Sequence, residues 1–490
     1  MSQYLAFDLG ASNGRCILGR FDGSRLELEV MHRFENYPVE LHGHWFWDIL
    51  KLYENIKTGL LRARREAPGG FAGFGLDTWG CDFALLDKAG KLAANPYCYR
   101  DPHTRGIYTE AFARVPKEEI FRQTGLQFME PNSLFHLLAL HIHDDPVLRI
   151  AATYLQIPDL LHYWLTGVIG CEYTDASTSQ MLDAHSRDWA WPLIRGMGLP
   201  EQIFPPIIPT ASILGPLRPA LADELRLGKT PLIASATHDT ASAVVATPTA
   251  GGRFGYLSSG TWGLLGTEID APLITPACLQ YNFTNEGGAF NKIRLLRNIV
   301  NLWFVQECQR QWSLEDEQLS WDDLIGLASA APAFTSLIDP NALEFLAPGN
   351  MPARIQAYCQ RTGQPAPEDK GSLLRCVLES LAFEYRHTLE QLNEVTGEPL
   401  EAMHIIGGGS RNRLLNQFAA DAMGIPVIAG PAEATAIGNI LTQMVATGEL
   451  ASLEEARALV RASFETETFL PAPPAHAGWD AVYPRYLRLL

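Results

Sequence analysis

The chain has 490 residues, 47% of them hydrophobic, and its 38 basic and 55 acidic residues give a formal net charge of −17. This length predicts about two to four domains, and the lack of a Lys/Arg-rich run argues against nucleic acid or an anionic membrane surface as a partner. Neither a signal sequence nor an apolar run of about 18 residues stands out, so we expect a cytoplasmic protein without a membrane span.

The eight cysteines are scattered along the chain and form no C-x-x-C pair, which argues against a zinc site. In a reducing compartment, all eight are expected to be free thiols. Cys359 and Cys376 flank one passage from a loop to a helix, so a bridge between these two stays open as an alternative.

The first half of the chain opens with a predicted hairpin. Residues 4–9 and the segment CILGRF are short apolar runs of strand type, and GASNG between them is typical of a turn. The alternating segment 26–34 adds a third strand. The elements expected next are a helix over 47–67, a strand, turn and strand over 71–87, and helices around 105–150 and over 157–167.

The second half begins again after TPTAGGR, residues 247–253, whose composition is typical of a linker. Residues 255–269 predict a strand, a Gly/Ser/Thr turn and a strand, which mirrors the opening hairpin. The further elements expected are helices over 299–312 and 372–395, a βαβ unit over 402–430 and a helix over 432–448. The sequence therefore predicts two α/β domains of related fold, residues 1–246 and 253–490, that face one cleft.

Each predicted hairpin has a tip that suits a phosphate group. In DLGASNGR, Gly10 and Gly14 permit positive φ angles, and successive backbone amides can form an anion-binding nest. Asp8 lies near the end of the first strand, where its carboxylate could hold a metal ion directly or through water. The tip SSGTW, residues 258–262, has the same character, so two such tips facing each other would hold a polyphosphate from both sides.

Other nucleotide motifs give a mixed result. LRLGKT, residues 225–230, resembles the end of a P-loop, but Asp223 occupies the position of the first glycine. The G-x-G-x-x-G pattern of a dinucleotide site is absent from the first βαβ candidate. GGGSRN, residues 407–412, lies between a predicted strand and a predicted helix, where three consecutive glycines let a flat ligand lie against the backbone.

The segment SATHDTASAVVA, residues 235–246, places an ionisable carboxylate, Asp239, among small and apolar side chains. A buried carboxylate persists only with partners or a function. One interpretation is a helix N-cap, because Asp commonly precedes an Ala/Val-rich helix. The other is a catalytic base at the same helix start. Taken alone, the segment favours the N-cap.

Two further segments carry candidate sugar or nucleotide contacts. LDTWGCDF, residues 76–83, places an aromatic ring beside a glycine and carboxylates, which suits a sugar, with a tight turn and a packed Trp as the equal alternative. RLLRNIVNLWFVQ, residues 294–306, predicts an amphipathic helix with Asn298 and Gln306 roughly on one face. Core or surface polar residues are the alternative for that helix.

Together these motifs resemble the FGGY family of carbohydrate kinases. That resemblance implies two related actin/hexokinase-like (ribonuclease H-like) ATPase domains of α/β class that face a central cleft. The motifs that carry it are AFDLGASNGR, DTWGCDFALLD, YRDPHTR, SATHDTASAV, YLSSGTWGLLG, NFTNEGG, RLLRNIVNLW, HIIGGGSRN and GIPVIAGPAEATAIGN. They occur in order over nearly the whole chain, and HDT followed by SSGTW is the most specific pair.

The resemblance also implies roles for individual residues. Asp239 would be the general base, and Asp8 would assist Mg²⁺. The residues expected to bind ATP are Ala11, Ser12, Asn13, Gly14, Arg15, Thr261, Gln306, Gly407, Gly408 and Gly409. Those expected to contact the sugar are Gly80, His238, Asp239, Thr240 and Asn298. One departure from the family pattern is Asn13 in place of Ser, which keeps a polar donor.

The implied reaction is phosphorylation of the 1-hydroxyl of a ketose by ATP, with Mg²⁺ and the amides of the tips taking up negative charge. L-Rhamnulose is the expected substrate, in deoxysugar catabolism, and L-fuculose or a pentulose is the alternative. An actin-like ATPase module without sugar turnover is a further alternative, against which the intact HDT segment argues. The expected partners are the ketose and ATP, and the expected state is a monomer or homodimer.

Overall fold

The computed structural model describes residues 1–315, 318–347 and 349–490. The chain divides into two compact units that interleave along the sequence. The first contains Met1–Ala246, Glu268–Leu295 and Ala434–Ser463, and the second contains Thr247–Thr267, Leu296–Glu433 and Phe464–Leu490. The predicted domains follow the chain continuously, whereas the first unit takes two segments from the C-terminal half.

A six-stranded sheet with strand order β11-β12-β6-β1-β2-β3 forms the centre of the first unit. Its strands are β1 (Ser2–Leu9), β2 (Asn13–Phe21), β3 (Leu26–Glu35), β6 (Gly73–Thr78), β11 (Ser212–Pro216) and β12 (Pro231–Ala234). β1 pairs with β2 in an antiparallel hairpin and with β6 in parallel. The predicted opening hairpin and third strand are therefore confirmed.

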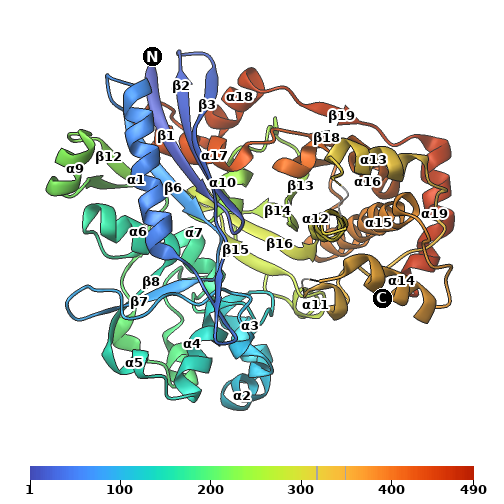
Figure 1. Cartoon of the computed structure of the whole chain (residues 1–490), viewed down its shortest axis with the longest axis horizontal. Helices are drawn as coiled ribbons and strands as arrows, with labels where there is room; N and C mark the ends of the chain where they lie inside the picture. Colours follow the sequence, from blue (N-terminus) through green and yellow to red (C-terminus); the bar gives the residue numbers. More distant parts are fainter. Residues whose placement is uncertain (316–317, 348) are drawn as a thin grey trace. The chain divides into compact units, whose positions relative to one another are not determined.

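Helices cover both faces of this sheet (Figure 1). On one face, α1 (Ile49–Glu66) approaches so closely that a Cβ at Gly59 would lie 2.6 Å from the Phe7 ring of β1. On the other face, α17 (Ala434–Ala446) packs against β1 and β6, and also against α10 (Asp239–Val245). A Cβ at Gly438 of α17 would lie 1.7 Å from the Ser242 carbonyl oxygen, so only glycine fits there.

Smaller elements complete the first unit. They are β4 (Val39–Leu41), β5 (His44–Phe46), β7 (Phe83–Asp87), α2 (Ile107–Arg114), α3 (Lys117–Thr124), α4 (Ser133–Ile142), α5 (Pro146–Ile150), β8 (Ala151–Gln156), α6 (Ile157–Thr166), β9 (Cys171–Glu172), α7 (Tyr173–Ala176), α8 (Trp191–Met197), β10 (Ile207–Ile208), α9 (Pro219–Leu225), α11 (Pro276–Gln280), β15 (Thr284–Gly287) and α18 (Leu453–Ser463). β6 and β7 do not pair with each other, because β7 pairs with β8 in a separate sheet. The loop between β6 and β7 therefore connects two sheets.

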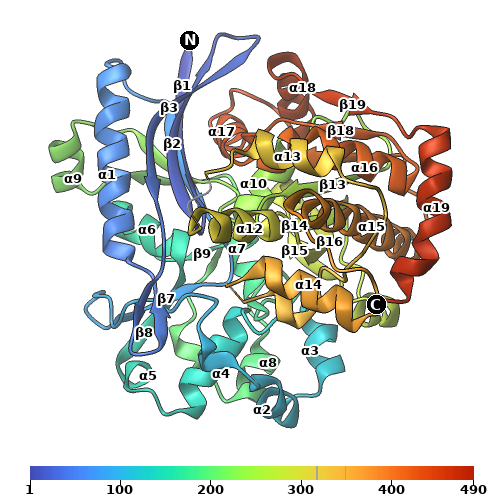
Figure 2. The ribbon, with the colours of Figure 1, turned by 45° about the vertical axis from the view of Figure 1, so that its right-hand side comes forward.

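Strands β14, β13, β17, β18 and β19, which are neighbours in that order, belong to the sheet of the second unit. Its elements are β13 (Phe254–Ser259), β14 (Trp262–Ile269), α12 (Trp303–Ser313), α13 (Trp321–Ala330), α14 (Met351–Arg361), α15 (Lys370–Thr396), β17 (Ala402–Ile406), α16 (Arg413–Met423), β18 (Val427–Ala429), β19 (Glu467–Phe469) and α19 (Pro473–Leu487). β13 and β14 form the second predicted hairpin, which is thereby confirmed. The long helix α15 packs against α13 and α16 (Figure 2).

The prediction of a single helix over 294–306 is wrong. Residues Ile293–Val300 form strand β16, and helix α12 begins only at Trp303. Most side chains of β16 are buried, so the segment lacks the polar–apolar alternation by which a half-exposed strand is recognised. Asn298 therefore lies on a strand and Gln306 on a helix, and the two do not share a helical face.

All eight cysteines are free thiols, so Cys359 and Cys376 are not bridged. Among the described residues, no helix combines the length and the apolar character that crossing a membrane requires.

Candidate active site

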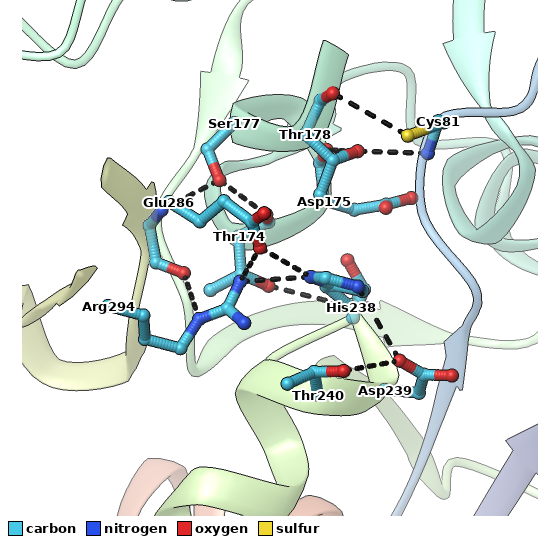
Figure 3. Close-up of polar contacts among 12 residues, drawn as sticks. Cys81, Thr174, Asp175, Ser177, Thr178, His238, Asp239, Thr240, Glu286 and Arg294 are labelled. Atoms are coloured by element: carbon cyan, nitrogen blue, oxygen red, sulfur yellow. Dashed lines mark hydrogen bonds and ion pairs between the residues drawn. The ribbon is translucent and has the colours of Figure 1, made fainter. Parts of the chain in front are cut away.

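The connection between β12 and α10 carries His238 and Asp239, and hydrogen bonds to its neighbours fix its backbone (Figure 3). Thr237 donates from its backbone N and its Oγ1 to Glu172 Oε2, at 3.1 and 2.7 Å. His238 N donates to Thr174 Oγ1 at 3.2 Å. The segment therefore leaves the sheet in a fixed direction, which sets where the side chains of His238 and Asp239 begin.

Asp239 is the first residue of α10, and His238 occupies the N-cap position. The N-cap interpretation of Asp239 is therefore wrong. Its Oδ1 accepts a hydrogen bond from Thr240 Oγ1 at 3.1 Å and lies 3.5 Å from His238 Nε2. The side chain keeps 30% of its exposure, so the carboxylate is within reach of a substrate.

The environment of Asp239 changes its proton affinity. Partial burial, followed by the negative charge of Asp8, raises the pKa of Asp239 to about 7. The hydrogen bonds from Thr240 and the positive charge of Arg294 act in the opposite direction and are outweighed. Because a general base works best with a pKa near the working pH, Asp239 combines access and basicity in the way that proton abstraction requires.

Two residues that sequence reasoning missed, Glu286 of β15 and Arg294 of β16, surround His238. Arg294 is fully buried, and its Nη2 lies 2.9 Å from both His238 Nδ1 and Glu286 Oε2. Burial and the Arg294 charge hold the pKa of His238 well below its usual range, so the imidazole is neutral. The sequence contains only a weak signal for this cluster, namely Glu286 in the TNEG strand and two arginines, Arg294 and Arg297, in an otherwise mostly apolar strand.

Asp175 of α7 places another buried carboxyl beside this cluster (Figure 3). Neither of its oxygens has a hydrogen-bond partner among the described residues. Burial, followed by the nearby carboxyls of Asp159 and Glu172, raises its pKa well above the usual range. Buried polar atoms without partners are uncommon in proteins, and a ligand hydroxyl is one group that can supply the missing hydrogen bonds.

The loop between β6 and β7 places Gly80 against Thr178. A Cβ at Gly80 would lie 2.9 Å from the Thr178 side chain, so a larger residue would displace the loop. Cys81 N donates to Thr178 Oγ1 at 2.9 Å and fixes the backbone just after Gly80 (Figure 3). Thr178 Oγ1 also donates to the Asp175 carbonyl at 2.8 Å, so the segment after α7 contacts both Asp175 and the backbone next to Gly80.

Trp79 and Asp82, from the same loop, belong to the core. The indole nitrogens of Trp47 and Trp79 both donate to Asp82 Oδ2 at 2.6 Å, and the two rings lie 4.1 Å apart. Trp79 is 6% exposed. Of the two interpretations of this segment, the structure therefore supports the tight turn with a packed Trp79, and not an aromatic ring directed at a sugar.

Acidic residues also meet at the ends of β1 and β6. Asp8 and Asp77 are register neighbours on these parallel strands, and Asp8 forms an ion pair with Arg15 of β2. Asp77 is fully buried and accepts a hydrogen bond from Asn439 of α17 at 2.5 Å. Burial, followed by the charge of Asp8, raises the pKa of Asp77 well above its usual range.

A magnesium ion is the metal that the resemblance implies. Among the described residues, no group of three or more His, Cys, Asp or Glu side chains is arranged to hold a metal. Mg²⁺ in nucleotide sites keeps several waters and binds one or two carboxylates plus the phosphates, so a larger protein cage is not needed. The Asp8 carboxylate, beside the Gly-rich tip, is an oxygen ligand of the right chemistry and fits this role.

Asn36 fixes the tip of the first hairpin. Its Nδ2 donates to the Gly10 carbonyl at 2.9 Å, and its backbone N donates to the Ser12 carbonyl at 3.1 Å. Gly10 and Gly14 do not adopt the positive φ angles that glycine permits. Gly14 instead makes room for the Phe34 ring, which would lie 2.2 Å from a Cβ. The five predicted ATP ligands Ala11, Ser12, Asn13, Gly14 and Arg15 all lie on this tip and the start of β2.

The second unit brings two predicted nucleotide ligands together. Thr261, at the tip of the β13–β14 hairpin, donates from Oγ1 to Gln306 Oε1 of α12 at 3.0 Å. Asn298 on β16 is the one predicted sugar contact in this unit, since Gly80, His238, Asp239 and Thr240 belong to the first. The predicted ATP ligands are likewise divided between the two units.

The glycine turn after β17 packs against β13 within the second unit. Gly407 has a φ of 84°, and a Cβ at Gly409 would lie 1.9 Å from Ser259 Oγ. Local structure therefore explains two of the three glycines. Gly408 has no atom within 4 Å of such a Cβ, so packing does not require glycine there, and its backbone stays open to a ligand.

Comparisons with known proteins place these features in context. The model of the FGGY family of carbohydrate kinases, N-terminal domain, matches residues 3–246, and that of the C-terminal domain matches residues 255–447. A rhamnulokinase from Bacteroides thetaiotaomicron is 44% identical over 480 residues, which cover 98% of each chain. A rhamnulokinase from Halalkalibacterium halodurans is 41% identical over 473 residues, which cover 96% of this chain and 99% of that relative.

Solved structures show the same fold. A xylulose kinase from Lactobacillus acidophilus matches with a TM-score of 0.82 at 17% identity, over 100% of this chain and 98% of that chain. A glycerol kinase from Plasmodium falciparum matches with a TM-score of 0.79 at 16% identity, over the same shares. At these identities the likeness concerns the fold alone, and the expected two-domain α/β fold is confirmed.

Proposed function

The chain belongs to the FGGY family of carbohydrate kinases, and from this premise we propose that it transfers the γ-phosphoryl group of ATP to the 1-hydroxyl of L-rhamnulose. The substrate follows from the two rhamnulokinases, which match this chain over nearly their whole length. The products are ADP and L-rhamnulose 1-phosphate, formed in the cytoplasm, where ATP is supplied. The observation that carries the chemistry is Asp239, an accessible carboxylate whose pKa is about 7.

In this proposal Asp239 is the general base. One of its oxygens accepts the proton of the 1-hydroxyl as the hydroxyl oxygen bonds to the γ-phosphorus, and the bond from that phosphorus to the bridging oxygen of ADP breaks. The residues assigned to hold the sugar are Gly80, His238, Thr240 and Asn298. Asp175 is added as a further sugar contact, because both its buried oxygens lack partners among the described residues.

The remaining assigned residues position ATP and neutralise its charge, which is the main task of a protein in phosphoryl transfer. The tip from Ala11 to Arg15, together with Thr261, binds the phosphates. Gln306 and the glycines from Gly407 to Gly409 contact the rest of the nucleotide. Asp8 would hold Mg²⁺, directly or through its water ligands, and the bound ion would supply positive charge to the phosphate oxygens.

A coupled assay of ADP release tests the proposal with the purified chain, ATP and a panel of L-rhamnulose, L-fuculose, L-ribulose and D-xylulose. We expect the highest kcat/KM for L-rhamnulose and a product phosphorylated at O1, identified by phosphorus NMR. A higher kcat/KM for another ketose would reassign the substrate. ADP release that no sugar stimulates would indicate an ATPase module, and a folded Asp239→Asn variant controls for contaminating kinases.

A further inference from the structure

Arg294 directs three hydrogen bonds into the cluster around His238 (Figure 3). Its Nε donates to the Gly287 carbonyl, and its Nη2 donates to Glu286 Oε2 and to His238 Nδ1, each at 2.9 Å. A guanidinium group has donors only, so His238 Nδ1 must be the acceptor. In a neutral imidazole the proton then resides on Nε2.

We propose that Arg294 is a positioning residue, which holds His238 in the tautomer protonated at Nε2 and thereby determines which oxygen of Asp239 acts as the base. The inference rests on the proposed function, because it takes Asp239 to be the group that accepts the substrate proton. Arg294 acts through His238 and needs no contact with the substrate. Its full burial is consistent with such an indirect role.

The tautomer matters because of what faces Asp239. His238 Nε2 lies 3.5 Å from Asp239 Oδ1, and Thr240 Oγ1 donates to the same oxygen at 3.1 Å. With the proton on Nε2, two donor groups face Oδ1 and hold it. The second oxygen of Asp239 points away from both side chains (Figure 3), and its lone pairs are left for the proton of the substrate hydroxyl.

Glu286 explains why a donor is needed at Nδ1. Glu286 Oε2 lies 3.5 Å from His238 Nδ1, and it would attract a proton to that nitrogen if Arg294 did not donate to both groups. The imidazole would then be protonated at Nδ1 and would turn the lone pair of Nε2 toward Asp239 Oδ1. Repulsion between these two acceptors would displace the carboxylate from the hydroxyl that it must deprotonate.

The Arg294→Met variant tests this directly. Nitrogen NMR of the full chain with labelled histidine reports the tautomer, and the His238 signal is assigned by its loss in His238→Gln. We expect the Nε2–H form in the wild-type protein and in Arg294→Lys, whose ammonium still donates to Nδ1, and the Nδ1–H form in Arg294→Met. In the Met variant kcat should fall about tenfold or more, while the KM for ATP stays near the wild-type value.

A second set of variants keeps the test meaningful if Arg294→Met does not fold. In His238→Gln the amide nitrogen reaches the position of Nε2 and still donates, whereas the shorter side chain of His238→Asn does not reach it. We therefore expect a higher kcat for Gln than for Asn. In the double variant Arg294→Met/Glu286→Gln, kcat should recover in part relative to Arg294→Met, because no carboxylate draws the proton to Nδ1.

Arg457→Met is the matched control. Arg457 is another buried arginine of the first unit, which donates to Glu268 and, at 3.2 Å, to the Val244 carbonyl. Its loss should lower the thermal midpoint and leave both the His238 tautomer and kcat unchanged.

The proposal is overturned by an Nδ1–H tautomer in the wild-type protein, by an unchanged tautomer in folded Arg294→Met, or by equal kcat values for His238→Gln and His238→Asn. The tautomer is read without substrate. Failure of the proposed function would instead appear as a wild-type chain that phosphorylates no ketose, so the two failures are distinguishable.

Discussion

Asp82 and Asp239 are two carboxyl groups with the same raised pKa, about 7, and burial is the largest cause for both. Their surroundings differ. Asp82 is 2% exposed, and two indole N–H groups donate to one of its oxygens. The Asp239 side chain is 30% exposed, and the Thr240 hydroxyl and the edge of His238 lie beside one of its oxygens. A raised pKa therefore does not identify a base by itself, because access and the neighbouring donors decide the role.

The largest expected effect separates these two residues by activity. Asp239→Asn removes the group that accepts the hydroxyl proton, so kcat should fall by about 10²–10⁴, the usual cost of a lost general base. The thermal midpoint should change little, because Asn keeps the size and polarity of the side chain. Steady-state phosphorylation with ATP binding measured in parallel checks this, and a kcat within a few-fold of wild type would contradict the assignment.

The pH dependence of kcat/KM gives the next largest effect. A base must be ionised, and with a pKa of about 7 the protonated form of Asp239 dominates below neutrality. We therefore expect kcat/KM for the ketose to fall about tenfold per pH unit below about pH 7 and to level off above it. Asp82→Asn should show the same profile, and a profile that flattens in this variant would assign the titration to Asp82.

Asp82→Asn should affect stability in place of activity. In this variant an amide NH2 group replaces one carboxyl oxygen, so a buried hydrogen-bond donor faces other donors. This should lower the free energy of unfolding by about 1–3 kcal/mol. We expect kcat to stay within a few-fold of wild type. Because folding raises the pKa of Asp82, the folded state binds more protons than the unfolded state between about pH 4 and 7, and this carboxyl contributes less to stability as the pH rises. Unfolding by urea should therefore show a larger penalty at pH 5 than at pH 8, and a penalty that grows with pH would contradict this.

Asp175→Asn has the smallest expected effect on activity. Like Asp82, Asp175 is a buried carboxyl with a raised pKa, but no indole donates to it among the described residues. If it hydrogen-bonds a sugar hydroxyl, the loss of about 1 kcal/mol should raise the KM for the ketose about fivefold, with kcat and the thermal midpoint nearly unchanged. Ketose titrations at saturating ATP measure this. A lower thermal midpoint without a change in KM would make Asp175 a structural residue.

The sequence predicted the parts of the molecule whose signals are local. Both hairpins, the βαβ unit after residue 402 and the helix that contains α17 follow from apolar runs, glycine turns and helical spacing. The strand over Ile293–Val300 was missed because its burial on both faces removes the alternation that marks a strand. The sequence favoured Asp239 as the N-cap of its helix, whereas His238 is the N-cap and Asp239 is the first residue of α10. Both residue types are compatible with the start of a helix, so the sequence did not distinguish the two positions.

The site was only partly predictable for a similar reason. His238 and Asp239 stand out within one segment, but the contact of Arg294 with His238 joins residues 56 positions apart. Nothing in the strand around Arg294 indicates that its side chain turns toward another segment. Likewise, the three glycines from Gly407 to Gly409 look alike in sequence. In the structure, Ser259 lies against Gly407 and Gly409 but not against Gly408, so local structure requires glycine at positions 407 and 409 only.

Helix α17 has a consequence for how the chain folds as it is made. Asn439 and Gln443 of this helix donate to Asp77 and to the Leu5 carbonyl, deep in the first unit. Synthesis starts at the N-terminus, and domains usually fold in the order in which they emerge. Here the ribosome must complete most of the second unit before the first receives the helix that covers one face of its sheet. Most of the first unit is therefore made early, but its folding cannot finish until a segment near the C-terminus, Ala434–Ser463, has emerged.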